Sequence, residues 1–555
     1  MDILKRILNL KIGNFPVLLK VIIFLALLIR LVNVSQNPPS LAWDEVAYGY
    51  NAYSLGIDGR DEFGVFLPYK YIESFGDFKP VVYAYLSVVP VKIFGLNEFA
   101  VRLPSILLGV FTVALTYFLV LRIFYTSKNK YYYALTGALF LAISPWHINL
   151  SRAAFEANVA TFFIVGGVWA FLAAIQDKKW YLIISTLFFS LSFYTFNTPR
   201  IVAPILVAFM ALGTWRELLK IKKQVILSIL VGLFLVLPIV PFLLSPQASL
   251  RFEEVNIFSD ISVIERTNQE IENDGGSILS KTIHNRRLAF SVEYMKHYLD
   301  TFNPGFLFIH GDENERFSTQ DVGQLYLWDL PFLIIGIGIL FLKRKDYWWV
   351  LPLWLLIGII PAATARETPH ALRLEITVPV LQIITAMGFV TIMSWLYHQK
   401  QKFIFYIAFS LLSFLLFINV SYYLHGYFKH YPREYSSRWQ YGYKEAVLFA
   451  LELEKNYDQI YVTNMLGRPY IYFLFYQKTD PDYFRKTAQV ERDVFGFVTV
   501  NSFGKYRFGD EKRIAEGDEG KKLFLGIPEN VPAGARKLRT FYTINGHPEL
   551  VAYTY

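Results

Sequence analysis

Cysteine is absent from this chain of 555 residues, and charged residues make up only 18% of it. Without cysteine there is no disulfide framework, no zinc ribbon and no thiol nucleophile. The charged fraction lies below the roughly 25% of an ordinary soluble chain, whereas 54% of the residues are hydrophobic and 17% are aromatic. So much apolar surface requires a bilayer as part of the solvent. The net charge of +9 does not by itself indicate a nucleic-acid partner. In a membrane protein, the distribution of basic residues among the loops is more informative than their sum, because it indicates the topology.

Sequence motifs of soluble enzymes and pumps are also missing. The chain has no Walker A loop, no GxGxxG after an expected strand, no HExxH and no GxSxG. Without a nucleotide-binding loop, we do not expect a primary pump.

A series of apolar stretches fills most of the chain instead. A membrane-spanning helix needs about 20 apolar residues, and eleven stretches reach or approach this length: 15–34, 101–124, 131–147, 154–175, 180–194, 200–214, 224–244, 329–342, 347–362, 374–396 and 403–424. The first follows the basic residues Lys5, Arg6 and Lys11 and lacks a small-residue cleavage site, so we interpret it as a retained anchor. The predicted fold class is an α-helical polytopic membrane protein with about 11 transmembrane helices.

The loops between these stretches alternate in charge. Lysine and arginine are concentrated in the first 20 residues and in loops 122–130, 176–179, 216–223, 343–346 and 397–402. Because short cytoplasmic loops are the basic ones, we predict a cytoplasmic N-terminus and an extracytoplasmic C-terminal part of a multi-pass cell-membrane protein. The predicted domains are a transmembrane domain over residues 1–427, with outer loops 35–100 and 245–328, and a soluble α/β domain over residues 428–555.

Two parts of the predicted outer side have regular structure of their own. Loop 35–100 contains an amphipathic run at 43–55 and an apolar run at 81–94, which we expect to be helices at the membrane surface. In the tail, expected strands alternate with helix-like stretches. The strands are at 460–463, 541–544 and 550–553, and the helices at 443–455 and 469–476.

The first candidate site is the acidic pair Asp44 and Glu45, just after the first span. On a helix that opens at Asp44, the side chains of Asp44, Tyr48 and Asn51 share one face. The helix dipole keeps a carboxylate at this end ionised, which suits a general base for an acceptor hydroxyl or amine. Tyr48 and Asn51 are then candidate substrate contacts. The competing interpretation is an N-cap aspartate beside a solvated glutamate.

Basic residues that depart from the positive-inside pattern form the second candidate site. Lys79 precedes the run at 81–94, and Arg200 opens the sixth span. Arg366, His370 and Arg373 precede the tenth span. Cations at bilayer depth are costly unless an anion compensates them, and guanidinium groups suit a phosphate. We therefore predict one pocket for a donor phosphate. The competing interpretation is snorkelling side chains and boundary charges.

Three further polar residues lie in outer turns or loops. Arg152 and Glu156 border the fourth span and are either functional or an i, i+4 ion pair that stabilises the helix end. His310 lies in the long outer loop. Arg152 and His310 are candidate substrate contacts.

Several of these segments together resemble the GT-C glycosyltransferases, above all the group that contains protein O-mannosyltransferases and the lipid A aminoarabinose transferase. The segments are Asp44 with Glu45, Lys79 with Pro80, NEFAVRLPS at 97–105, the stretch from Ser144 through Arg152 to Glu156, and the Pro-His-x-x-Arg turn at 369–373. The resemblance covers roughly residues 10–425. The tail is similar to the soluble outer domain that many of these proteins carry.

This resemblance implies an inverting transferase that uses a polyprenyl-phosphate-linked sugar at the outer membrane face. Asp44 matches the acid assigned to acceptor activation, Glu45 its neighbour, Glu156 the second acid, and Lys79 the lysine that contacts the lipid phosphate. The aminoarabinose transferases have a glutamate directly before that lysine, where this chain has Phe78. Whether a divalent metal takes part is therefore left open, with Asp44, Glu45 and Asp77 as its candidate ligands.

The predicted function is an integral-membrane inverting hexosyl- or pentosyltransferase, with a polyprenyl-phosphate-sugar donor and a lipid, glycan or protein acceptor. The alternative is a lipid-linked-sugar flippase or secondary transporter, which predicts inverted repeats and broken helices near the midplane. The polar residues gather instead at the outer ends of the spans. A receptor or assembly protein is disfavoured, because such a function would not require these outer polar clusters. An oligosaccharyltransferase would carry a Trp-Trp-Asp signature, but Trp349 is followed by Val350.

Overall fold

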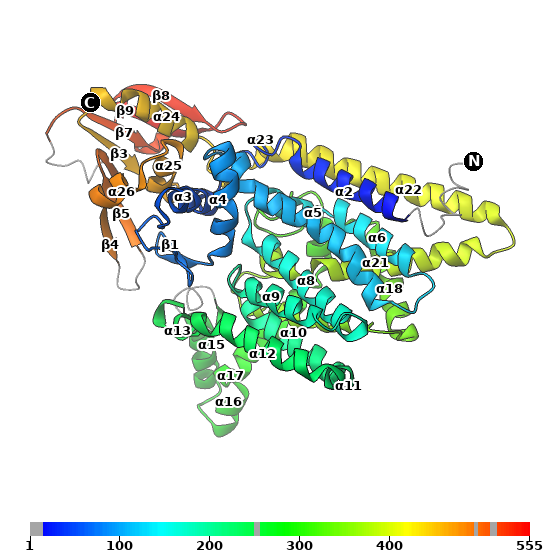
Figure 1. Ribbon diagram of the computed structural model, residues 1–555. Coiled ribbons are helices and arrows are strands. Elements are labelled where there is room, and N and C mark those ends of the chain that lie inside the picture. The colour runs from blue at the N-terminus through cyan, green and yellow to red at the C-terminus, as the bar shows by residue number, and fades with distance from the viewer. Residues whose placement is uncertain (1–14, 249–255, 493–497, 511–518) are drawn as a thin grey trace. The chain divides into compact units, whose positions relative to one another are not determined.

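The computed structural model describes residues 15–248, 256–492, 498–510 and 519–555 (Figure 1). The basic residues Lys5, Arg6 and Lys11 lie outside this part. The chain forms two compact units. The first unit comprises Met1–Ile29, Leu108–Leu150 and Ala157–Tyr423. The second comprises Arg30–Leu107, Ser151–Glu156 and Leu424–Tyr555.

Each of the predicted apolar stretches contains a helix. These helices are α2 (Phe15–Leu31), α5 (Glu98–Ile123), α6 (Lys130–Ile143), α8 (Glu156–Gln176), α9 (Tyr181–Phe193), α10 (Pro199–Gly213), α12 (Lys222–Val236), α18 (Asp329–Lys343), α19 (Val350–Ala362), α21 (Val378–Tyr397) and α22 (Lys402–His425). Within the described residues, five helical segments are long and apolar enough to cross a membrane: Glu98–Ile123, Glu156–Gln176, Trp215–Leu243, Ala371–Tyr397 and Lys402–Glu434. The chain is therefore a multi-pass membrane protein, and the count of eleven crossings stays a prediction.

Glycines allow two helices of the first unit to meet closely. A Cβ atom at Gly336 of α18 would lie 2.0 Å from the backbone oxygen of Ile384 in α21, and one at Gly388 would lie 1.9 Å from the backbone oxygen of Phe332. Membrane helices associate through such small residues because apolar side chains gain little by leaving lipid. Helix α21 also packs against α6.

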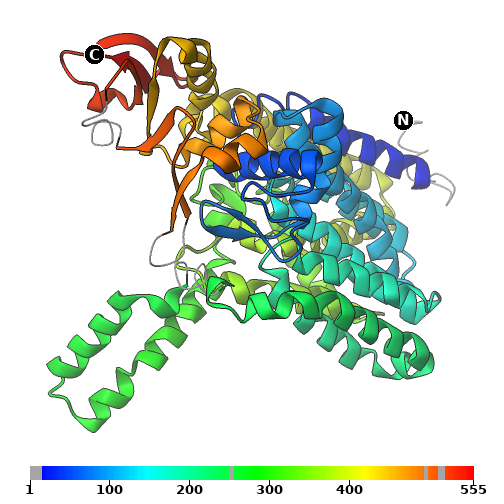
Figure 2. The same cartoon turned by 60° about the vertical axis from the view of Figure 1, so that its left-hand side comes forward.

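The predicted outer loop 245–328 contains several helices. It contains α15 (Ile261–Asn273), α16 (Ile278–Ile283) and α17 (Arg286–Asp300). Helices α15 and α17 pack side by side (Figure 2). The segment that ends at Ile309 carries His310 directly after it.

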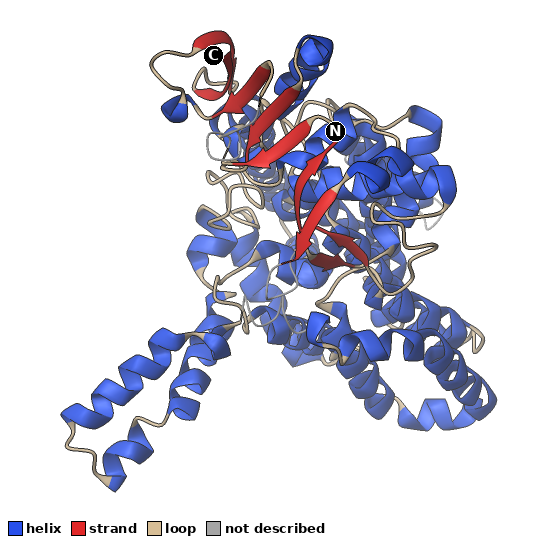
Figure 3. Cartoon of the chain, turned by 90° about the vertical axis from the view of Figure 1, so that its left-hand side faces the viewer, coloured by secondary structure: helices blue, strands red, loops and turns tan. Residues whose placement is uncertain are grey.

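The tail in the second unit is an α/β domain, as predicted. The tail strands form one sheet, in the order β4-β5-β6-β3-β7-β9-β8. Figure 3 shows the strands in red. They are β3 (Gln459–Thr463), β4 (Gln489–Arg492), β5 (Val498–Phe503), β6 (Tyr506–Gly509), β7 (Lys522–Gly526), β8 (Arg536–Tyr542) and β9 (Pro548–Thr554). The central strand β3 runs parallel to β6 and β7, and the other pairs are antiparallel. The helices are α24 (Tyr443–Leu453), α25 (Pro469–Tyr476) and α26 (Pro481–Thr487).

Loop 35–100 folds into α3 (Trp43–Asp58), the hairpin of β1 (Ile72–Ser74) and β2 (Asp77–Lys79), and α4 (Val82–Phe94). Both predicted helices are present. Helix α3 packs on α25 of the tail (Figure 1), because Gly49 leaves room: a Cβ atom there would lie 2.5 Å from the Phe475 ring. The loop and the tail therefore belong to one compact unit, whereas the sequence divided them at residue 427.

Candidate active site

The structure brings Asp44 and Lys79 into direct contact within the second unit. Asp44 lies in the first turn of α3 and Lys79 at the end of β2. The Lys79 ammonium donates a hydrogen bond to Asp44 and lies 3.3 Å from Asp77. The Lys79 side chain is 6% exposed and the Asp44 side chain 39%. The carboxylate is therefore open to a reactant, whereas the lysine is buried behind it.

Negative charge surrounds the Lys79 ammonium. Burial alone would lower the pKa of Lys79, but the charges of Asp44, Asp77 and Glu156 raise it above its ordinary value. We call these four residues the acid–lysine cluster. The Nζ atom also lies 5.7 Å from the centre of the Tyr48 ring and 5.3 Å from that of Phe75. The Tyr48 side chain is buried, and its predicted role as a substrate contact stays a prediction.

The N-terminus of α3 resolves the competing interpretation of Asp44. The cap residue is Ala42, not Asp44. The Ala42 N–H donates a hydrogen bond of 3.0 Å to Glu45 at the third helical position, so Glu45 performs the capping. Asp44 therefore has no N-cap role, and its contact is with Lys79.

Glu45 is a structural residue, which corrects its predicted catalytic role. Its carboxylate is fully buried and accepts bonds from the Arg102 Nε at 2.9 Å, the Arg102 Nη2 at 3.1 Å and the Ala154 N–H at 2.8 Å. Arg102, which lies in the run at 97–105, also donates to the carbonyls of Val34 and Pro38. With both oxygens engaged, Glu45 cannot act as a base for a substrate.

The predicted substrate contact Arg152 is also structural. It is fully buried, donates bonds of 2.8 Å to the carbonyls of Val32 and Asn37, and lies over the rings of Tyr427 and Phe428. The competing interpretation, an i, i+4 ion pair of Arg152 with Glu156, is wrong, because α7 (Pro145–Arg152) ends before α8 begins at Glu156. Glu156 instead contributes its charge to the acid–lysine cluster.

Asn51 belongs to a buried network around Glu62 that the sequence did not reveal. The Asn51 amide and the Ser74 hydroxyl each donate a bond of 2.8 Å to one Glu62 oxygen, and the Tyr470 hydroxyl donates one of 2.8 Å to the other. The Asn51 amide oxygen accepts the Glu62 N–H. Asn51 therefore has no capacity left for substrate. The network joins α3, the β1–β2 hairpin and α25, which positions the elements that carry Asp44 and Lys79.

Glu62 gives the stability of this unit a predictable pH dependence. Burial raises the pKa of Glu62 from 4.5 to about 8, although bonds from Tyr470, Ser74 and Asn51 lower it. The folded chain thus holds a proton that the unfolded chain releases, so the free energy of unfolding falls as pH rises from 4.5 to 8. The slope contributed is at most about 1.4 kcal/mol per pH unit. We expect Glu62→Gln to flatten the pH dependence of thermal unfolding in detergent.

The exposed Glu491→Gln is the matched control for that measurement, because Glu491 is an exposed carboxylate of the same unit. It should keep the slope of the original chain. An identical slope in Glu62→Gln and in the original chain would show that Glu62 is ionised in the folded protein.

The other predicted basic residues lie in the first unit. The Arg200 Nε donates to the Phe193 carbonyl at 3.1 Å, and the Arg366 Nε donates to the Asn256 carbonyl at 3.1 Å. The His370 ring lies 5.0 Å from that of Phe317. Burial, and then the charge of Arg373, lower the pKa of His370 to about 3. His370 is therefore neutral and offers a hydrogen bond rather than a charge.

His310 and its neighbour Asp312 belong to the first unit as well. His310 is exposed, and its carbonyl accepts a bond of 2.9 Å from the Ser318 hydroxyl. Asp312, which the sequence did not single out as functional, accepts the N–H of Ala371 and so anchors the loop to the start of the helix after His370. The substrate contact of His310 stays a prediction, as does a pocket shared by Lys79 with the basic residues of the first unit.

The carboxylates named as candidate metal ligands do not fit a divalent cation. Both oxygens of Glu45 are engaged, and the Lys79 ammonium contacts both Asp44 and Asp77, where the cation would have to bind. Within the part of the chain that the structure describes, no three histidine, aspartate or glutamate side chains form a group that could hold a metal ion. We therefore derive no step through a metal.

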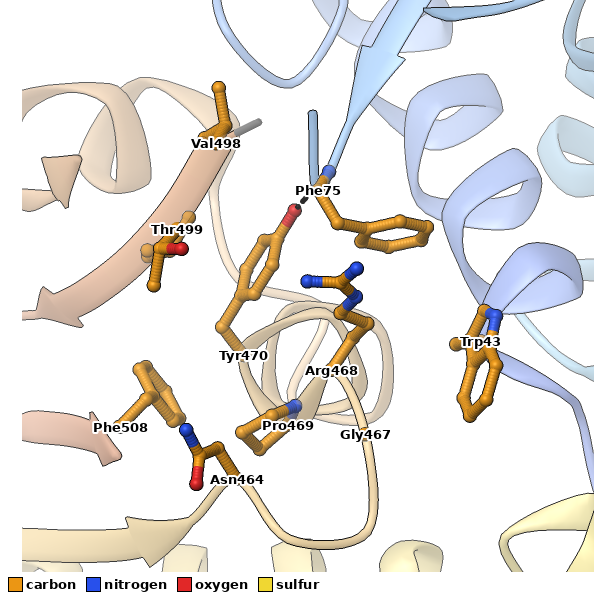
Figure 4. Close-up of a pocket in the computed structure, with 11 residues that line it drawn as sticks. Trp43, Phe75, Asn464, Gly467, Arg468, Pro469, Tyr470, Val498, Thr499 and Phe508 are labelled. Atoms are coloured by element: carbon orange, nitrogen blue, oxygen red, sulfur yellow. Dashed lines mark hydrogen bonds between the residues drawn. The ribbon is translucent and has the colours of Figure 1, made fainter. Parts of the chain in front are cut away.

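A pocket of about 400 Å³ opens beside the cluster, within the same unit (Figure 4). Its walls include Trp43, Phe75, Tyr470, Phe508, Asn464 and Arg468. The Tyr470 hydroxyl accepts a bond from the Phe75 N–H. We call this the aromatic pocket.

Solved structures with the same architecture define the class of fold. The crystal structure of ArnT from Cupriavidus metallidurans, apo or bound to undecaprenyl phosphate, matches 96% of this chain and 97% of that chain, with 12% identity and a TM-score of 0.52. The oligosaccharyltransferase AglB from Archaeoglobus fulgidus, in complex with an inhibitory peptide and a dolichol-phosphate, matches 83% of this chain and 63% of that chain, with 14% identity and a TM-score of 0.52. The chain has the GT-C fold, as its resemblance predicted.

Sequence comparison gives a more particular likeness over part of the chain. Residues 78–242, which include Lys79, Glu156 and Arg200, match the family described as dolichyl-phosphate-mannose-protein mannosyltransferase. An uncharacterized protein of Aquifex aeolicus (strain VF5) is 36% identical over 147 residues, which cover 26% of this chain and 29% of that protein. The match thus spans less than a third of that relative.

Proposed function

We propose that the protein is an inverting glycosyltransferase that moves a sugar from a polyprenyl-phosphate-linked donor to an acceptor at the outer membrane face. The observation that carries the proposal is the contact of the accessible Asp44 carboxylate with the buried Lys79 ammonium. A base that faces the acceptor and a cation that faces the leaving phosphate are the two groups that such a transfer needs.

One displacement accounts for the reaction. The acceptor oxygen attacks the anomeric carbon and forms the new glycosidic bond, while the bond from that carbon to the donor phosphate oxygen breaks. Its electron pair leaves with the polyprenyl phosphate, and Asp44 takes the acceptor proton. Because attack and departure occur on opposite faces, the anomeric configuration inverts.

The donor phosphate competes with Asp44 for Lys79 in this scheme. The ammonium is paired with Asp44 in the structure, so a phosphate that takes over this pairing releases the carboxylate to act as the base. Arg200, Arg366 and Arg373 stay predicted sources of further positive charge for the phosphate, and neutral His370 a predicted hydrogen-bonding group. ArnT has been solved with undecaprenyl phosphate and AglB with dolichol-phosphate, which supports a polyprenyl donor.

The test is a transfer assay on the full chain in nanodiscs, with undecaprenyl-phosphate-linked hexose or pentose as donor. We expect acceptor-dependent release of undecaprenyl phosphate, detected by mass spectrometry. Lys79→Gln should lose about 1.5–3 kcal/mol of stabilisation, or roughly ten- to hundredfold in rate. The exposed Lys92→Gln on α4 is the matched control. Movement of intact donor across the bilayer without release would favour a flippase instead.

The orientation follows from the charge pattern and has its own test. A reporter fused after Lys402 should be cytoplasmic, and one fused after Tyr435 extracytoplasmic, because α22 and the residues that follow it connect these points. If both reporters were on the same side, the count of eleven spans would be wrong and the site would not face outward.

A further inference from the structure

The aromatic pocket adjoins both reacting groups of the proposed site. Trp43 directly precedes Asp44, and the Phe75 ring lies 5.3 Å from the Lys79 ammonium. The indole of Trp43 packs on Gly467, where a Cβ atom would lie 2.9 Å from the ring. Gly467 has a φ of +115°, which favours glycine. The wall of the pocket is therefore built by close contact between α3 and the loop before α25.

Arg468 lies in a different setting from three paired arginines of the second unit. Arg102, Arg485 and Arg492 each pair with a carboxylate. Arg468 is exposed, and its guanidinium lies 5.5 Å from the centre of the Phe75 ring. Within the described residues, no carboxylate forms an ion pair with it. Figure 4 shows the guanidinium between Phe75 and Tyr470, inside the ring of aromatic side chains. The pocket thus offers a bidentate donor for an anion.

We propose that the aromatic pocket binds the acceptor, and that this acceptor is a saccharide unit that carries an anionic group, a carboxylate or a phosphate. The inference rests on the proposed function, whose acceptor it specifies. A sugar ring packs its C–H face on an aromatic ring, while the side chains of Asn464 and Thr499 in the lining bind its hydroxyl groups. The anionic group pairs with Arg468, and a free hydroxyl then reaches Asp44 through the side of the pocket that Trp43 forms.

The sheet argues against a peptide acceptor in this pocket. A peptide that binds to a sheet uses the unpaired main chain of an edge strand. The lining strands β5 and β6 are internal, because β5 lies between β4 and β6, and β6 lies between β5 and β3. An acyl chain fits no better, since it would leave the Arg468 guanidinium desolvated without an anion.

The experiment measures binding of small saccharides to the full chain in nanodiscs by saturation-transfer NMR. The probes are methyl β-D-glucuronide, glucose 6-phosphate, neutral methyl β-D-glucoside and inorganic phosphate. We expect one of the anionic sugars, or both, to bind at least about tenfold more tightly than the glucoside, and inorganic phosphate not to displace it. The stronger of the two identifies the anionic group as carboxylate or phosphate.

Two variants test the assigned contacts. Arg468→Gln should abolish the preference for an anionic sugar and leave weak binding of the glucoside. Trp43→Leu should weaken the binding of all three sugars. The exposed Arg536→Gln on β8 is the matched control and should behave like the original chain. The proposal would be overturned if the original chain bound the neutral and anionic sugars equally, or if Arg468→Gln kept the preference for an anionic sugar. It would also be overturned if an acidic peptide displaced the sugars at lower concentration.

Donor binding separates this proposal from the function on which it rests. Undecaprenyl phosphate should bind equally to the original chain and to Arg468→Gln, because Arg468 is not in the acid–lysine cluster. If the chain binds the anionic sugars but no polyprenyl phosphate, the proposed function is wrong, and the proposal that the pocket binds an anionic sugar is supported. If it releases donor phosphate but binds none of the sugars, the pocket proposal fails alone.

Discussion

Replacing Asp44 with asparagine is expected to lower the rate of sugar transfer by about 10²–10⁴-fold, the usual contribution of a general base. An amide keeps the size and polarity of the carboxylate but accepts no proton. The start of α3 should not change, because Glu45 and Ala42 cap the helix. Expression and thermal unfolding of Asp44→Asn should therefore match those of the original chain, and donor binding should persist because Lys79 becomes more available to phosphate.

Asp77→Asn is the matched control for this prediction. Asp77 lies 3.3 Å from the same ammonium and is also partly exposed, but no acceptor role is assigned to it, so the loss should be less than about tenfold. The loss of transfer rate in Glu156→Gln should lie between the losses in Asp44→Asn and Asp77→Asn, since Glu156 acts through the charge of the cluster. More than a tenth of the original rate in Asp44→Asn would exclude Asp44 as the base.

Breaking the Arg102–Glu45 pair is expected to have the largest effect on folding. Arg102→Leu leaves the fully buried Glu45 carboxylate without its cation and removes the bonds to the carbonyls of Val34 and Pro38. Loss of one partner of a buried pair costs about 3–5 kcal/mol. We expect poor yield and a clearly lower midpoint of thermal unfolding in detergent. Glu45→Gln should lose less, because an amide can still accept a bond from Arg102.

An exposed pair is the control for this effect. Lys486 and Asp482 are paired at spacing i, i+4, with side chains 71% and 61% exposed. Lys486→Met should leave the unfolding midpoint unchanged, since solvent screens such pairs. A normal midpoint for Arg102→Leu would mean that the buried pair does not hold the start of α3 in place.

Hydropathy was enough to predict the apolar helices and the presence of a C-terminal α/β part, but not the grouping of loop 35–100 with that part. Each predicted stretch contains a helix because an apolar segment in lipid must satisfy its own backbone hydrogen bonds. Of the tail strands, the predicted ones correspond to β3, β8 and β9, whereas β4 to β7 were missed. The β4 side chains are all exposed, so this strand has no alternation of apolar and polar residues to detect.

Local sequence also pointed to Asp44 and Lys79, which the structure places together, although 35 positions separate them. Local sequence could not distinguish the accessible carboxylate of Asp44 from the buried one of Glu45, because the difference depends on which distant residues each of them contacts. The partner of Glu45 is Arg102, 57 positions away. The same reason applies to Arg152 and Asn51, which looked like substrate contacts and are buried among carbonyls and a carboxylate.

The sequence by itself determined the membrane class, the helices and the acidic and basic residues from which the site is built, because these depend on local composition and periodicity. Only the tertiary structure decided which carboxylate is accessible, that Glu62 joins three elements, and that Arg468 lies in an aromatic pocket beside Asp44. Each of these depends on contacts between α3, the β1–β2 hairpin and α25, and no local pattern of residues encodes which distant charge a buried group will meet.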